Sequence, residues 1–102
     1  MTAEPASAEK SAGDPRRFLR SGLLDSMPRR WRDKLAVTRY LAARAMPVLL
    51  EPMTERELTD RLRELARDPV GLRRAMVDQG LVQRTRDGAE YWRTERTEYD
   101  ES

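Results

Sequence analysis

Residues 54–93 read TERELTDRLRELARDPVGLRRAMVDQGLVQRTRDGAEYWR and contain the signals that decide the fold. The stretch opens with a capping box, in which the Thr54 hydroxyl accepts from the amide of Glu57 and the Glu57 carboxylate reaches back to the amide of Thr54. Apolar residues then recur at helical spacing: Leu58, Leu62, Leu65 and Ala66. This pattern predicts an amphipathic helix that begins at Thr54.

A second helix follows almost without a loop. Asp68 is a good N-cap residue, and Pro69 suits the first helical position because its missing N–H is not needed there. The helix is expected from Val70 to Gln79, with Leu72 and Met76 facing inward, and Gly80 ends it as a left-handed C-cap. Because so short a connection keeps the two helices from lying parallel, we expect them to cross steeply as a helix-turn-helix.

The helices lead into a hairpin. Asp87-Gly88 separates two strand-like runs, residues 81–86 and 89–93, and an Asp-Gly pair in this setting is a strong hairpin signal. Period-two alternation places Arg84 and Arg86 on one face of the first strand.

Upstream of residue 54, the sequence predicts a first helix. Pro28 suits its first position, and Pro47 ends it near Ala45. A 3.6-residue apolar stripe runs along it: Trp31, Leu35, Thr38, Leu41, Ala42 and Ala45. The apolar residues between Phe18 and Leu24 are expected to cover the core as a short helix or strand. The connector 48–53 has room for only a minimal strand.

These elements predict an α+β fold, mostly α: a winged helix-turn-helix with three core helices followed by a two-stranded β-hairpin wing. The domain is expected to span residues 15–93, between a disordered tail of residues 1–14 and an acidic tail of residues 94–102. Trp31 and Trp92 are expected in the core, and Tyr91 on the exposed strand face. Three ion pairs are expected on the helix that begins at Thr54: Glu57–Arg61, Asp60–Arg63 and Glu64–Arg67.

Composition excludes several classes of function. The chain has no cysteine and no histidine, so thiolate metal sites and every nucleophile that relies on a histidine base are absent. It contains no glycine-rich phosphate loop. Arginines interleave the acidic residues Glu57, Asp60 and Glu64, so ion pairing explains these carboxylates better than a magnesium site. No apolar run approaches about 20 residues, and the N-terminus is unlike a secretory signal. We therefore expect a cytoplasmic protein that is not an enzyme and has no cofactor or membrane association.

The sequence also resembles a short bacterial domain family of unknown function, which occurs alone or behind the helix-turn-helix of transcriptional regulators. The matching pieces lie within residues 16–93: Phe18-Leu19, Leu24, Pro28, Leu35-Ala36-Val37, Tyr40-Leu41-Ala42, Met53-Thr54-Glu55-Arg56-Glu57, Leu72-Arg73-Arg74, Val77-Asp78-Gln79-Gly80-Leu81 and Tyr91-Trp92-Arg93. The family has a longer segment between its second and third helices than this chain. The resemblance implies this fold and a role in transcription control.

The distribution of charge indicates a binding surface. The net charge is only +2, but residues 15–44 hold nine basic and two acidic residues, a local +7, and eighteen of the twenty basic residues of the chain are arginine. Arginine suits phosphates and base edges, although codon usage in a genome rich in G and C also explains the bias. Candidate DNA contacts fall on the third helix, the hairpin and the basic block: Gly71, Arg73, Arg74, Arg84, Arg86, Arg16, Arg17, Arg29, Arg30 and Arg32.

Two functions fit these residues. The first is a small winged-helix DNA-binding protein that regulates transcription, with the third helix and wing on double-stranded DNA and the basic block adding affinity for phosphates. A homodimer is a further possibility, through the connector 48–50 or the segment 18–24. The second is a protein-interaction module that binds an acidic regulator or the transcription machinery through the same basic surface. Alternatively, Arg73 and Arg74 form ordinary surface ion pairs with Asp78, Asp68 or Glu64.

Overall fold

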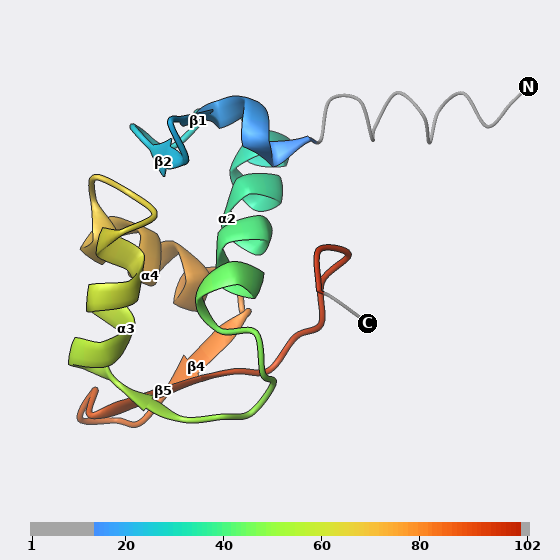
Figure 1. Cartoon of the computed structure of the whole chain (residues 1–102). Coiled ribbons are helices and arrows are strands. Elements are labelled where there is room, and N and C mark those ends of the chain that lie inside the picture. The colour runs from blue at the N-terminus through green and yellow to red at the C-terminus, as the bar shows by residue number, and fades with distance from the viewer. Residues whose placement is uncertain (1–13, 101–102) are drawn as a thin grey trace, which may run out of the picture.

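A computed structural model describes residues 14–100 of the chain. It contains three α-helices, α2 (Trp31–Ala45), α3 (Glu55–Arg63) and α4 (Pro69–Asp78), and the short 3-10 helix η1 (Pro15–Phe18). The strands β1 (Leu19–Arg20) and β2 (Leu23–Leu24) form one small antiparallel sheet, and β3 (Met53–Thr54), β4 (Val82–Arg84) and β5 (Glu90–Arg93) form a second (Figure 1). The fold is therefore α+β, as predicted, with more residues in helices than in strands.

Helix α2 begins three residues later than predicted. Its N-cap is Arg30, which makes no side-chain capping bond, and Pro28 lies outside the helix. Four residues of the predicted stripe, Thr38, Leu41, Ala42 and Ala45, are buried together with Val37, whereas Leu35 is half-buried. Trp31 was expected in this core, but 62% of its surface is exposed. The helix ends at Ala45, just before Pro47, as predicted.

Helices α3 and α4 begin with the predicted caps. The Thr54 hydroxyl accepts from the Glu57 amide at 3.0 Å, and Glu57 accepts from the Thr54 amide at 2.8 Å. At α4, the Asp68 carboxylate accepts from the Gly71 amide at 2.9 Å. Gly80 adopts the left-handed conformation, with φ of 78°, that ends α4. The two helices pack through four side chains with 0–1% exposure: Leu58, Leu62, Leu72 and Met76.

Of the three ion pairs expected on α3, only Asp60–Arg63 is present, at 2.6 Å. Arg61 instead donates to the main-chain carbonyl of Ala45 at 2.7 Å, because this acceptor at the C-terminal end of α2 lies within its reach. Arg67 pairs with Asp25. The predictions of Glu57–Arg61 and Glu64–Arg67 were therefore wrong, since each arginine has a partner on a different element.

The second sheet has the strand order β3-β5-β4, so β3 adds a third strand to the predicted hairpin. The pairs Val82–Arg93 and Arg84–Tyr91 centre the hairpin on Asp87-Gly88, as the sequence indicates. Both strands are shorter than expected at the turn, because β4 ends at Arg84 and β5 begins at Glu90, and the five residues 85–89 join them. Gly88 has a φ of 75°, which only glycine adopts readily.

The two aromatic residues of β5 face the opposite way from the prediction. Tyr91 is 4% exposed and belongs to the core, whereas Trp92 pairs with Gln83 and is only half-buried. Tyr91 shares its face of the sheet with Val82 and Arg93, and all three are buried. The prediction failed because the fold buries Arg93 and pairs it with Asp100, so the face of β5 that holds Tyr91 and Arg93 turns inward.

The segment before α2 is held against the turn between α3 and α4. Ser21 and Gly22 form the turn of the β1–β2 hairpin with positive φ values of 54° and 80°. The Leu24 amide then donates to the Leu65 carbonyl at 2.8 Å, and the Arg67 amide donates to the Leu24 carbonyl at 3.0 Å. Figure 1 shows this hairpin above the α3–α4 turn. The predicted cover over the core is therefore a hairpin.

Residues 94–100 fold back onto α2, although the sequence predicts a tail there. Arg93, whose side chain is fully buried, donates to the Met46 carbonyl at 2.7 Å and to Asp100 Oδ2 at 3.0 Å. Tyr99 packs edge-on against Tyr40 of α2, with ring centroids 5.6 Å apart. The predicted N-terminal tail lies outside the described residues, except for Asp14. Within residues 14–100, no helix has the length and apolar character to cross a membrane.

Candidate nucleic-acid interface

The outer face of α4 is the central element of the candidate interface. Leu72 and Met76 point into the core, so the opposite side of the helix faces solvent. Val70, Arg74 and Asp78 are exposed on that side, and Val77 is half-buried beside them. Arg74 makes no ion pair within residues 14–100, and it is the cation that α4 presents outward.

Arg73, a predicted DNA contact, has three internal partners instead. Its side chain is 17% exposed; it donates to Thr59 Oγ1 at 2.6 Å and pairs with Glu55 Oε2 at 2.9 Å. Its guanidinium also lies 5.5 Å from the centre of the Tyr91 ring. These contacts join α4 to α3 and to the sheet, so Arg73 orients α4 rather than projecting from it. Arg73 therefore forms an ion pair, as the alternative interpretation expected, but its partner is Glu55 and not Asp78, Asp68 or Glu64.

The Asp68 cap explains why residue 71 is a glycine. A methyl group built on Gly71 would lie 2.8 Å from Asp68 Cγ, which is closer than real side chains approach. The Asp68 carboxylate thus occupies the N-terminal end of α4, where a phosphate would otherwise bind the free amides. Glycine is required at this position by the cap, so the predicted phosphate contact at Gly71 has no open site.

The hairpin supplies two exposed arginines. Arg84 ends β4, and Arg86 lies in the loop, so they do not share one strand as predicted. The Thr85 hydroxyl orders this loop by donating to Asp87 Oδ1 at 2.7 Å and accepting from the Ala89 amide at 3.0 Å. The bonds from the Thr85 hydroxyl and the Ala89 amide hold the pKa of Asp87 below its ordinary value. Within the described part of the chain neither arginine has an ion-pair partner.

The basic block splits into two groups. Arg29, Arg30 and Arg32, at the start of α2, are exposed and form no ion pair between residues 14 and 100. By contrast, Arg16 is 3.3 Å from Asp14, and Arg17 is 3.3 Å from Asp33 and stacks on the Phe18 ring. Arg16 and Arg17 are therefore weaker candidates for phosphate contacts than the three arginines at the start of α2.

A cavity of about 450 Å³ lies between the first turns of α2 and helix α4. Lys34 of α2 and Arg74, Gly71 and Asp78 of α4 line it together with the segment that follows β2. Figure 1 places the start of α2 and the β4–β5 turn at opposite ends of the molecule, with α3 and α4 between them. The free arginines therefore form an extended series rather than one compact patch.

The two segments named as possible dimer contacts differ in exposure. In the connector between α2 and β3, Val48 and Leu50 are 54% and 65% exposed, and Leu50 has a φ of 68°. In the other segment Leu24 is 3% exposed, and Phe18 and Leu19 pack against the core. Of these two segments, the connector is the one with exposed apolar side chains that a second copy of the chain could contact. A dimer through this connector stays a prediction. No group of three acidic residues within the described chain is arranged to hold a metal ion.

The model of a family described as "Uncharacterized protein conserved in bacteria (DUF2087)" matches residues 23–93. The matched segment runs from β2 to the end of β5, so it holds all three α-helices and the three-stranded sheet. The match confirms the resemblance to a bacterial domain family of unknown function. No curated protein and no solved structure matches the chain.

Proposed function

The chain belongs to the DUF2087 family of uncharacterized bacterial proteins, and we propose that it is a small winged-helix protein that binds double-stranded DNA to regulate transcription. The order α2, β3, α3, α4, β4, β5 and the strand order β3-β5-β4 support this proposal. In this arrangement, α3 and α4 are the helix-turn-helix and the β4–β5 hairpin is the wing.

The observation that carries the proposal is a series of exposed arginines on both sides of α4 that have no ion-pair partner among residues 14–100. Arg74 stands on its outer face, Arg84 and Arg86 lie on the hairpin, and three more arginines lie at the start of α2. An extended polyanion such as a DNA duplex can contact all of these positions at once, whereas a small anion can contact only one group.

The arginines divide the contacts between bases and phosphates. Arg74 is the residue that α4 would insert into the major groove, where a guanidinium reads guanine O6 and N7. Arg84 and Arg86 would contact the backbone or the minor groove beside it. Arg29, Arg30 and Arg32 would add phosphate contacts that carry no sequence information.

The test measures binding of the full chain to a DNA duplex of random sequence and about 24 base pairs. Fluorescence anisotropy gives the affinity at salt concentrations between 50 and 200 mM. If the five arginines other than Arg74 each neutralise one phosphate, the slope of log K against log salt approaches about −4.5. Replacement of Arg96 by glutamine is the matched control, because Arg96 is an exposed cation on the tail (74% exposed) outside the proposed interface. No binding at 50 mM salt would contradict the proposal.

A protein-interaction module is the second candidate, and one observation favours it. Trp31 is 62% exposed between Arg30 and Arg32, and an exposed tryptophan flanked by cations suits a protein interface. The overall net charge of +2 is also low for a dedicated DNA-binding protein. This candidate is favoured if the chain does not bind DNA at low salt but does bind an acidic protein. The Trp31→Ala variant should then lose binding to that protein.

A further inference from the structure

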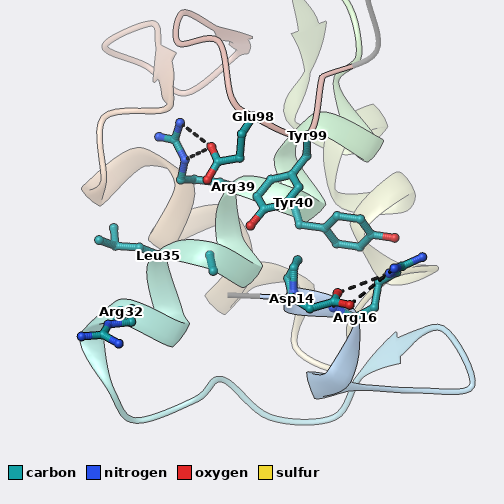
Figure 2. A pocket seen from close by; sticks show the side chains of 10 residues that line it. Asp14, Arg16, Arg32, Leu35, Arg39, Tyr40, Glu98 and Tyr99 are labelled. Carbon is teal, nitrogen blue, oxygen red and sulfur yellow. Dashed lines mark hydrogen bonds and ion pairs between the residues drawn. The ribbon is translucent and has the colours of Figure 1, made fainter. Parts of the chain in front are cut away.

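A second concave site lies on the outer side of α2. Figure 2 shows this groove, which has a volume of about 770 Å³, within the range of small-molecule sites. Its floor is one side of α2. One wall comes from the residues around η1, and the other comes from the folded-back tail. The residues that supply the walls, Asp14, Pro15, Arg16, Glu98 and Tyr99, all lie outside the segment 23–93 that matches the family.

Internal contacts hold both walls in place. Arg39 of α2 donates to Glu98 Oε1 at 3.0 Å and to the Arg96 carbonyl at 3.3 Å, which fastens the tail to the helix. Tyr99 rests edge-on against Tyr40. On the other side, the Asp14 carboxylate accepts from the Arg16 amide at 3.1 Å and caps η1. The groove is therefore preformed and does not have to close around a ligand.

The groove has one more cation than anion. It is lined by three arginines and two carboxylates, and Figure 2 shows both carboxylates bonded to arginines, Asp14 to Arg16 and Glu98 to Arg39. The third arginine, Arg32, stands at the far end without an ion pair in the described chain. Burial, followed by the charge of Glu98, raises the pKa of Tyr99, so its phenol is neutral at physiological pH and adds no anion.

The remaining surface of the groove is apolar or aromatic. Leu35 and Ala36 supply the apolar part of the floor. Figure 2 shows Leu35 beside Arg32, and the rings of Tyr40 and Tyr99 toward the other end. A ligand that lies along the floor would therefore meet Arg32 with one end and the two rings with the other. Apolar and aromatic walls with one convergent charge are typical of sites for small organic ions.

We propose that this groove binds a small aromatic monoanion, such as an aryl carboxylate or sulfonate. The anionic group pairs with Arg32, and the ring lies on Leu35 against Tyr40 and Tyr99. A guanidinium suits a carboxylate because its parallel N–H groups match the two oxygens. A dianion would leave one charge without a partner, since the other two arginines already bind carboxylates. Arg32 also belongs to the proposed DNA interface, so a phosphate and the ligand would compete for it, and the test below uses the chain without DNA.

The test uses 8-anilinonaphthalene-1-sulfonate, a fluorescent aromatic monoanion, with the full-length chain. We expect saturable binding at one site, and an affinity about ten-fold lower for Arg32→Gln. Arg32 is exposed, so this variant keeps the fold, which circular dichroism verifies. Arg56→Gln removes the same charge from an exposed position on α3 that does not line the groove, and is expected to leave the affinity unchanged. The neutral analogue N-phenyl-1-naphthylamine should bind wild type and Arg32→Gln equally.

Amide chemical shifts locate the probe independently. We expect the largest changes at Leu35, Ala36 and Tyr99, and none at the β4–β5 loop. The proposal is overturned if binding does not saturate, or if Arg32→Gln and Arg56→Gln weaken it to the same extent. Shift changes centred away from α2 and the tail would overturn it as well.

Discussion

Arg93 and Asp100 form a buried ion pair that joins the end of β5 to the folded-back tail. Arg93 Nη2 lies 3.0 Å from Asp100 Oδ2, and Nη1 lies 3.0 Å from Oδ1. The same guanidinium donates to the carbonyls of Met46 and Glu95, each at 2.7 Å. One side chain thus links the C-terminal end of α2, the sheet and the tail that forms one wall of the groove.

Removing the guanidinium is expected to cost much of the stability of the chain. Arg93→Ala removes the cation that pairs with the Asp100 carboxylate, which is 9% exposed, and the donor to the Met46 carbonyl. Loss of one partner of a buried pair costs about 3–5 kcal/mol. Urea unfolding measures the free energy, and Arg96→Ala is the control because its side chain is 74% exposed. A loss below about 1 kcal/mol in Arg93→Ala would show that the pair is not structural.

The same pair predicts loss of stability in acid. Burial raises the pKa of Asp100, but the hydrogen bonds from Arg93 and Thr97 together outweigh it, so the pKa falls below its ordinary value of 3.8. A carboxyl whose pKa is lower in the folded state stabilises the fold above its unfolded pKa, and this stabilisation is lost as the pH falls through the folded pKa. We expect unfolding free energies from pH 6 to 2 to fall less steeply in Asp100→Asn than in wild type. Parallel curves would contradict this.

Gly71 and Asp68 are expected to be coupled. Gly71→Ala places a methyl group against the Asp68 carboxylate, so the variant loses either the cap or the local geometry. We expect a loss of about 1–2 kcal/mol. In an Asp68→Ala background the clash disappears, and alanine then gains up to about 1 kcal/mol over glycine within a helix. A double-mutant cycle by urea unfolding checks the change of sign, and additive effects would argue against the coupling.

Local signals in the sequence predicted the backbone well. The capping box at Thr54, the Asp68-Pro69 junction, Gly80 and Asp87-Gly88 each act within a few residues, so their outcome does not depend on the rest of the fold. The later start of α2 is one exception. Its N-cap residue, Arg30, makes no side-chain capping bond, so no capping side chain marks that boundary in the sequence.

The partners of charged and aromatic side chains could not be predicted in the same way. Arg73 meets Glu55 and Tyr91, and Arg93 meets Asp100 and Met46, only because the fold brings those segments together. An arginine that forms such contacts looks the same in sequence as one that binds DNA. The groove on α2 was missed for the same reason, since its walls come from the two flanks of the domain.

The most direct test of the central claim is the salt dependence of DNA binding in the triple variant Arg74→Gln/Arg84→Gln/Arg86→Gln. Each lost phosphate contact flattens the slope of log K against log salt by about 0.9. We predict a slope about 2 to 3 smaller in magnitude than in wild type, with Arg96→Gln unchanged. Equal slopes in wild type and the triple variant would contradict an interface formed by α4 and the hairpin.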